Sequence, residues 1–317
     1  MTDTILRTSP HSGANRWQPL GLRTDPFPAS PQSGTFLSNV AHFAVLNAFE
    51  RWMTASTAAP LALVTGPEGS GKTRLLHEIG RVVAGNNVTR PGIIAGDGTR
   101  RTDIQLLRRI IHALDGTPAG RTGLQLQAEA RALFAQVNDQ GKYPLLLIDD
   151  ANFTGSQLEI VRSLLSGEPV RMVLFGEPDL ADRVQRRQSL QALTGLNEQI
   201  VPLTTEEALA FIRQGIDAVR LDRSESQHII EEVALAMIAR QSGGNIGNIG
   251  RMMRAVLEES LLHNRVIDTG LVQQVLANLP EPAHTANAPA TPPRAMRDSA
   301  VQTRIPLDFF QGEESNA

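Results

Sequence analysis

The sequence predicts an α/β fold in which a parallel five-stranded sheet lies between helices and is followed by a small all-helical domain. Between Leu61 and about residue 203, short apolar segments alternate with amphipathic ones, which is typical of buried parallel strands joined by helices. After about residue 204 the strand pattern stops, and only helical patterns continue to Leu279. At 317 residues and 41% hydrophobic, the chain suits about one or two domains with sizeable cores.

The first 35 residues predict a flexible N-terminus and an extended arm. Residues 1–16 are polar and show no period, and residues 17–35 combine prolines and glycines with a few large apolar groups. We expect the α/β domain to occupy residues 36–203. It should open with a helix at about 38–55, for which Ser38 is a plausible N-cap.

Five strands are expected in this domain, with helices in the intervals. The strand segments are LALVT (61–65), PGIIAG (91–96), YPLLLID (143–149), VRMVLFG (170–176) and EQIVPL (198–203). The helices are expected at 72–84, 102–114, 121–139, 154–165 and 179–187. Apolar runs of this kind, bounded by turn residues, indicate strands that are buried on both faces.

The all-helical domain is expected over residues 204–280. It opens with a threonine cap and early glutamates, which is a helix-start signal. The residues expected on one face of the next helix are Ile230, Val233, Ala234, Met237 and Ile238. Those expected on one face of the following helix are Ile249, Met252, Met253 and Val256.

Residues 281–317 are expected to form a disordered tail with one apolar segment, Ile305–Phe310. The apolar side chains of that segment are Ile305, Leu307, Phe309 and Phe310. They suggest a docking motif for a partner protein. Folding back onto the chain's own domain is the alternative.

Composition argues against several classes of site. Without cysteine there are no disulfides, thiolate metal sites or Cys nucleophiles, and the seven histidines lack metal-site spacing. No run approaches the ~18–20 apolar residues of a membrane span, and the N-terminus lacks the apolar core of a signal peptide. We therefore expect a cytoplasmic protein with no membrane insertion. With a net charge of −3, nucleic-acid binding would need a local basic patch.

One glycine-rich segment predicts a phosphate site. TGPEGSGKT, residues 65–73, has the pattern G-x-x-x-x-G-K-[ST] between an expected strand and an expected helix. Its glycines let backbone N–H groups turn inward around phosphates, and the helix N-terminus adds positive potential. Lys72 should neutralise the β- and γ-phosphates, and the Thr73 hydroxyl should ligate Mg²⁺. The expected ATP-binding residues are Gly66, Pro67, Glu68, Gly69, Ser70, Gly71, Lys72, Thr73 and Arg74.

An acidic pair ends the third expected strand, in LLLIDD. We expect Asp149 to hold Mg²⁺ and Asp150 to polarise the water that attacks ATP. Two solvated carboxylates at a strand end are the alternative. Because aspartate is one methylene shorter than the more usual glutamate, the water must lie closer to the strand. Glu177, at the end of the next strand, is either a sensor of the γ-phosphate or a plain strand-end carboxylate.

Three groups of arginines are candidates for contacts with phosphate, and a solvated helix face is the alternative for each group. The candidates to act on a neighbouring subunit's nucleotide are Arg183, Arg186 and Arg187. The candidates to reach the nucleotide from the helical domain are Arg251 and Arg254. The candidates for nucleic-acid phosphates, in RRTDIQLLRR, are Arg100, Arg101, Arg108 and Arg109.

From about Leu20 to Leu279 the chain resembles the AAA+ ATPases of the ExeA/GspA secretion group and the related TniB-type transposition ATPases. GLRTDPFP is similar to their entry arm, FLSNVAHFAVLNAF to the helix that follows, and VLFGEPDLADRV to their sensor segment. SGGNIGNIGRMMRAVLEES is closer to the lid helix of the transposition relatives. The resemblance implies a P-loop AAA+ fold with a helical lid, and a homo-oligomer with ATP and Mg²⁺ at its subunit borders.

The chain departs from the secretion family in four places. The family has glutamate at Asp150, glutamine at Glu177, an arginine-rich segment in place of LQALTGLNEQI, and a lid arginine at Gly247. The last three departures predict slow hydrolysis without the usual trigger between subunits. The first is milder, because replication-initiator ATPases have a similar IDD pair.

Two functions are consistent with these residues. The first is a cytoplasmic ATPase that binds Mg-ATP, oligomerises, hydrolyses ATP slowly, and recruits or remodels a protein partner. The second is an ATP-gated, non-specific DNA-binding adaptor of a transposition or mobile-element system. A static scaffold that has lost ATP turnover is a third and weaker alternative.

Overall fold

The computed structural model describes residues 16–30, 37, 39–55, 57–98, 101–221 and 230–280. The chain divides into two compact units: an α/β unit within residues 38–202, and a helical unit that joins residues before 38 to residues 203–280. The segment Ile305–Phe310 lies outside the described residues. Within the described part of the chain, no helix combines the length and the apolar character needed to cross a membrane.

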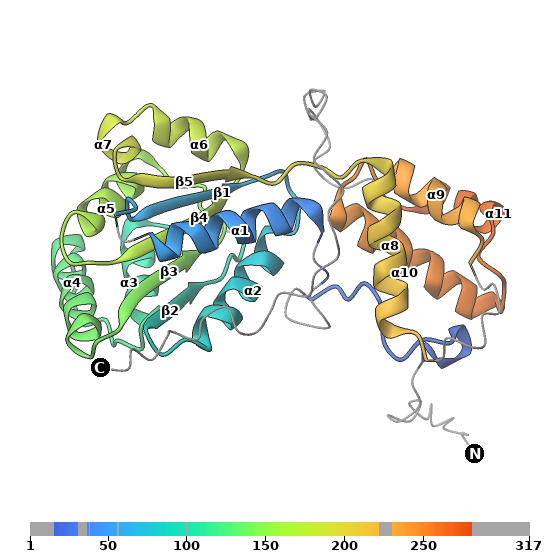
Figure 1. The fold of residues 1–317 in the computed structure, drawn as a ribbon, viewed down its shortest axis with the longest axis horizontal. Coiled ribbons are helices and arrows are strands. Elements are labelled where there is room, and N and C mark those ends of the chain that lie inside the picture. The colour runs from blue at the N-terminus through green and yellow to red at the C-terminus, as the bar shows by residue number, and fades with distance from the viewer. Residues whose placement is uncertain are drawn as a thin grey trace, which may run out of the picture. The chain divides into compact units, whose positions relative to one another are not determined.

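A parallel five-stranded sheet forms the centre of the α/β unit, as the sequence predicts (Figure 1). Its strands are β1 (Leu61–Thr65), β2 (Thr89–Ile94), β3 (Tyr143–Ile148), β4 (Arg171–Gly176) and β5 (Thr194–Gln199). Their order is β2-β3-β4-β1-β5, and every neighbouring pair is parallel. All five carboxyl ends therefore lie at one edge of the sheet, which is where open α/β sheets bind ligands.

Helices cover both faces of this sheet. They are α1 (Val40–Thr54), α2 (Lys72–Ala84), α3 (Asp103–Ala113), α4 (Gly123–Asp139), α5 (Gly155–Leu165), α6 (Pro178–Gln185) and α7 (Gln188–Gln191). Alternate side chains of β1, β3 and β4 pack in one apolar cluster with residues of α3 to α6. Figure 1 shows α1 and α2 on the other face. Helices α3, α4 and α5 each begin with a threonine and a glutamine that form a capping box.

Two details of the predicted elements are wrong. The fifth strand is Thr194–Gln199, not residues 198–203, and its residues alternate between half-buried and exposed. Because β5 is an edge strand it carries no apolar run, whereas the apolar residues after it pack as irregular chain. The N-cap of α1 is Asn39, whose side chain accepts a hydrogen bond from the His42 amide at 2.9 Å. Ser38 lies outside the described residues.

The helical unit has its own apolar core. Its elements are the 3₁₀ helix η1 (Gln18–Leu20) and the helices α8 (Thr205–Val219), α9 (Glu232–Gln241), α10 (Ile246–His263) and α11 (Thr269–Asn278). Phe27 of the arm packs against Phe211 of α8, with ring centroids 6.1 Å apart. The arm is thereby part of this core.

One predicted face of the helical unit is confirmed and another is partly wrong. The α10 residues Ile249, Met252, Met253 and Val256 are buried, as expected. Before α9, however, Ile230 lies outside the helix, and Val233 is 65% exposed. The helix starts at Glu232, and it packs through Ala234, Leu235, Ile238 and Ala239, a face rotated from the predicted one.

Candidate nucleotide-binding site

The loop between β1 and α2 has the backbone of a phosphate cradle. Gly69 and Gly71 have φ angles of 74° and 87°, in the left-handed region that glycine adopts without strain. A Cβ atom on Gly66 would approach the Ser70 hydroxyl oxygen to 2.8 Å. The chain is therefore too tightly wound at these points for larger residues. The N-terminus of α2, which begins at Lys72, follows directly and adds positive potential.

Lys72 lies along this loop. Its ammonium group donates hydrogen bonds to the carbonyl oxygens of Gly66 and Pro67, each at 2.8 Å. Burial lowers the pKa of Lys72 below its ordinary value, and four nearby carboxylates oppose this effect. In order of effect they belong to Asp149, Glu177, Asp150 and Glu68. The site thus gathers one ammonium and several acids around the loop.

Thr73 and Asp149 lie in direct contact, close enough for both to ligate one magnesium ion. The Thr73 hydroxyl donates a hydrogen bond to Oδ2 of Asp149 at 2.7 Å. Asp149 is 2% exposed, and its Oδ1 finds no hydrogen-bond partner among the described residues. No group of three or more histidine or acidic side chains in the described ranges could hold a metal by itself. The set fits Mg²⁺, which is usually held by one or two protein ligands together with phosphate oxygens and water.

Asp150 follows β3 in a strained backbone conformation. Its φ angle is 48°, which is uncommon for any residue except glycine, although aspartate tolerates it better than most. Oδ2 of its carboxylate accepts a hydrogen bond from the Gly98 amide at 3.2 Å. A Cβ atom on Gly96 would overlap that carboxylate. The chain after β2 therefore leaves room for the Asp150 side chain and holds it in place.

Glu177 is exposed at the end of β4, where it forms the N-cap of α6. Its side chain makes no capping hydrogen bond to that helix. Its carboxylate is close enough to Lys72 to oppose the lowering of the lysine pKa. Its role as a sensor remains a prediction.

His42 is a site residue that sequence reasoning missed. It is 2% exposed on α1, its Nε2 donates to the Ser70 carbonyl oxygen at 3.0 Å, and its Nδ1 accepts from the Asn39 side-chain Nδ2 at 3.1 Å. Burial lowers the pKa of His42 to about 4, although the bond to Ser70 opposes this. The ring is therefore neutral at pH 7 and supports the cradle from behind. The available signal was its position in FLSNVAHFAVLNAF, the helix segment of the family resemblance.

Most of the candidate arginines are engaged within their own unit. Arg183 donates to the Phe153 carbonyl oxygen at 2.7 Å, and Arg187 donates to that of Arg183 at 2.8 Å. Arg186, between them, is exposed. In the helical unit, Arg251 contacts the Pro280 carbonyl oxygen, and Arg254 pairs with Asp25 at 3.3 Å. Arg186 is thus the candidate for an inter-subunit contact that the structure leaves exposed.

The predicted phosphate-binding role of Arg101 is wrong. Arg101 is only 9% exposed, and it donates to the Asp149 and Ala95 carbonyl oxygens at 2.9 and 3.0 Å. Arg109 forms an ion pair with Asp97, whereas Arg108 is exposed. Arg100 lies outside the described residues. The basic segment therefore serves largely to bind its own domain.

Comparison with known proteins agrees with this geometry. Residues 55–184 match the family described as AAA domain. Over 261 residues the chain is 25% identical to the chromosomal replication initiator protein DnaA of Cutibacterium acnes, which covers 79% of this chain and 46% of that protein. The chain thus spans less than half the length of that curated relative.

Solved structures show the same fold. The Cdc6p structure of Pyrobaculum aerophilum gives a TM-score of 0.64 at 17% identity, covering 79% of this chain and 71% of that one. The Aeropyrum pernix ORC1 protein, solved in complex with DNA, gives 0.62 at 13% identity, over 83% and 69%. Domain III of Thermotoga maritima DnaA gives 0.52 at 17% identity, over 78% and 95%.

These findings support a likeness to replication initiators and do not distinguish the secretion or transposition grouping. The matched segment contains the cradle, the acidic pair and Glu177. The sheet with its phosphate loop has the P-loop AAA+ fold. Residues 55–184 are therefore similar to AAA domains, and they contain the phosphate cradle and the acidic pair.

Proposed function

We propose that this protein binds Mg-ATP between the residue 66–74 loop and the carboxyl ends of β3 and β4, and hydrolyses it slowly. The observation that carries the proposal is the 2.7 Å contact between Thr73 and Asp149, which joins the cradle to the strand-end acid. The Lys72 ammonium, which now bonds two loop carbonyls, has the reach and charge to bind the β- and γ-phosphates. Bound Mg²⁺ would neutralise further charge on those phosphates.

The hydrolytic step is assigned to Asp150. Its carboxylate is partly exposed beside Asp149, so it can accept a hydrogen bond from a water aligned with the γ-phosphate. That water supplies the oxygen that attacks phosphorus, the bond to the β-phosphate oxygen breaks, and ADP and phosphate form. The short aspartate side chain and the engaged Arg183 and Arg187 support slow turnover.

We further propose that the protein forms a homo-oligomer in the cytoplasm and recruits or remodels a protein partner. Arg186 is exposed in the turn just after α6 and is the best-placed of these arginines to reach the nucleotide of a neighbouring subunit. The grouping with secretion or transposition ATPases, and docking through Ile305–Phe310, rest on sequence resemblance and pattern alone.

The test uses the full chain and its two lysines, Lys72 and Lys142. We expect Lys72→Ala to weaken binding of a fluorescent ATP analogue with Mg²⁺ by about a hundredfold or more, because a preorganised charge contact is lost. Lys142→Ala is the matched control and should bind as the wild type does. Asp150→Asn should still bind but lose about a hundredfold in turnover. Equal binding by both lysine variants would refute the assignment.

A second candidate function is an ATP-gated, non-specific DNA-binding adaptor. Two observations favour it: the similarity to DnaA, a replication initiator, and the shared fold with ORC1, which was solved with DNA. Of the basic segment described, however, only Arg108 is freely exposed. Retention of duplex DNA that requires ATP and weakens steeply with salt would select this function. ATP-dependent assembly without DNA affinity would select the first.

A further inference from the structure

Arg101 joins the ends of β3, which the acidic pair follows, and of its neighbour β2. One terminal nitrogen of its guanidinium donates to the Asp149 carbonyl oxygen at 2.9 Å, and the other donates to that of Ala95 at 3.0 Å. Asp149 follows β3, and Ala95 follows β2. A planar guanidinium with two terminal nitrogens can hold two carbonyl groups at a fixed spacing, which a lysine ammonium cannot do in the same way.

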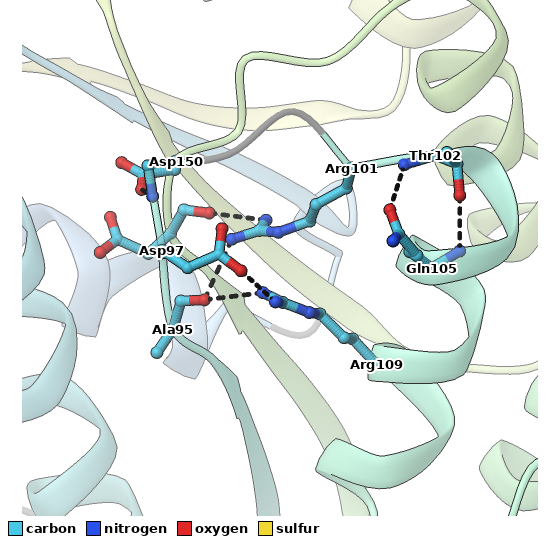
Figure 2. A network of polar contacts seen from close by, with 9 residues as sticks. Ala95, Asp97, Arg101, Thr102, Gln105, Arg109 and Asp150 are labelled. Atoms are coloured by element: carbon cyan, nitrogen blue, oxygen red, sulfur yellow. Dashed lines mark hydrogen bonds and ion pairs between the residues drawn. The ribbon is translucent and has the colours of Figure 1, made fainter.

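Arg101 is itself held from two sides. The side-chain amide of Gln157 on α5, which is 2% exposed, donates to the Arg101 carbonyl oxygen at 2.6 Å. Arg109 on α3 also donates to the Ala95 carbonyl oxygen, at 3.2 Å, and pairs with Asp97 (Figure 2). Figure 2 shows both guanidinium groups reaching the chain just after β2. The guanidinium group of Arg101 is therefore fixed in position relative to β2 and β3.

The Asp149 carbonyl belongs to the peptide group that precedes the Asp150 Cα atom, so its orientation sets the φ angle of Asp150. The peptide group on the other side is held as well. The Ala151 amide donates to the Phe175 carbonyl oxygen at 2.8 Å, and the Asn152 amide donates to that of Asp150 at 2.7 Å. A non-glycine residue stays at φ 48° only where its surroundings determine the backbone on both sides. Arg101 supplies the first of these two restraints.

We propose that Arg101 is a positioning residue for the nucleotide site: it holds the left-handed turn that aims the Asp150 carboxylate and keeps Asp149 beside Thr73. The proposal rests on the proposed function where it concerns ATP. Arg101 is assigned no contact with the nucleotide, and its effect is exerted through the two aspartates. It replaces the phosphate-contact role that the basic segment predicts for this residue.

A stability cycle without nucleotide tests the backbone part. We expect Arg101→Lys to raise the unfolding equilibrium constant about tenfold in urea titrations of the full chain. In the Asp150→Gly background the increase should be less than about threefold, because glycine adopts a left-handed φ without help. Asp150→Asn, which removes the charge but keeps similar backbone tolerance, is the matched background and should keep the tenfold effect.

Equal effects of Arg101→Lys in the glycine and asparagine backgrounds would overturn the proposal. If Arg101→Lys folds only in the Asp150→Gly background, the proposal is supported in a stronger form. If it folds in neither, Arg101 serves the domain as a whole, and the positioning role is wrong.

A magnesium titration tests the functional part. We expect Arg101→Lys to lower kcat about tenfold and to raise the Mg²⁺ concentration for half-maximal binding of a fluorescent ATP analogue about fivefold. At saturating Mg²⁺ its affinity and KM should stay within about threefold of wild type, because the loop is untouched. Arg108→Ala removes an exposed arginine of α3, the helix that follows Arg101 in the chain, and should match wild type.

The outcomes separate this inference from the proposed function. If the wild type neither binds nor hydrolyses ATP, the proposed function fails, and the stability cycle still decides whether Arg101 holds the Asp150 backbone. If the wild type is active while Arg101→Lys matches Arg108→Ala in kcat and in Mg²⁺ dependence, the positioning role fails alone.

Discussion

Two buried arginines lie at opposite edges of the same sheet and have different structural roles. Arg171 begins β4, at the edge formed by the amino ends of the strands, and Arg101 lies at the carboxyl edge; each is 9% exposed. Arg171 donates to the carbonyl oxygens of Trp52, Met53 and Ala55 at 3.1, 2.5 and 2.8 Å. It thus satisfies carbonyl groups at the C-terminus of α1, which have no partner within the helix.

The difference lies in what surrounds each guanidinium. Arg171 lies over the rings of Trp52 and Tyr143, 5.1 and 5.6 Å from their centroids, and so adds cation–π contact to its hydrogen bonds. At the carboxyl edge, by contrast, buried side-chain atoms remain without a hydrogen-bond partner in the described residues: Ser70 Oγ, Arg101 Nε and Asp149 Oδ1. Arg171 is thus paired for stability, whereas the carboxyl edge retains the Ser70 and Asp149 oxygen atoms, which can bind a ligand.

The largest effect is expected from Arg171→Met. It should lower the free energy of unfolding by about 4 kcal/mol, because two or three buried carbonyl groups lose their donor and the cation–π contacts are lost. Urea unfolding of the full chain measures this. Protein that remains folded should bind Mg-ATP as the wild type does. Weaker Mg-ATP binding with unchanged stability would break the comparison, since it would place Arg171 in the functional edge.

A smaller effect concerns His42, which lies near the start of α1, the helix whose other end Arg171 caps. Between pH 6.5 and about 4 the unfolded chain binds a proton that the buried ring excludes. The contribution of the neutral His42 ring to the free energy of unfolding is therefore fully present above pH 6.5. It is lost as the pH falls to about 4, by about 3 kcal/mol in total. In His42→Gln, the unfolding free energy measured across this pH range should lack the part of its pH dependence that His42 contributes. An unchanged slope would show that His42 is not the titrating group.

The smallest effect is expected from Gly96→Ala at the carboxyl edge. The new methyl group would overlap the Asp150 carboxylate and displace it, while the backbone of residue 96 needs no left-handed conformation. Turnover should fall about tenfold, and the free energy of unfolding should change by less than about 1 kcal/mol. Gly123→Ala, where a Cβ atom meets nothing within 4 Å, is the matched control for both measurements. Equal turnover in the two variants would show that Asp150 does not act from this position.

The sequence predicts the parts of this molecule in which local pattern and tertiary role agree. The strands β1, β3 and β4 are continuous apolar runs because they are buried on both faces. The contact between Thr73 and Asp149 could be anticipated because both residues end a strand or start a helix at the same edge. In each case the residue type, its spacing and the element that carries it point to the same structure.

The remaining features depend on contacts that no local pattern encodes. In the sequence, Arg101 is one of several basic residues near the start of a helix. Its burial depends on contacts with the ends of β2 and β3, which the local sequence does not reveal. The edge strand β5 has no apolar run, so the sequence predicts its start several residues after the true start at Thr194. Val233 has an apolar side chain but is exposed, because α9 packs against the unit through Ala234, Leu235 and Ile238 instead. The left-handed turn at Asp150 is likewise fixed by neighbouring strands.

That turn explains which acid the chain can use there. Aspartate and asparagine enter the left-handed region far more readily than glutamate does, since their short polar side chains can bond locally. A site built on φ 48° at residue 150 thus disfavours the longer acid on conformational grounds, apart from any effect on rate. Replacing Asp150 by glutamate would therefore also require a change in the backbone of this turn. The substitution alone would not reproduce the activity of a relative that has glutamate at this position.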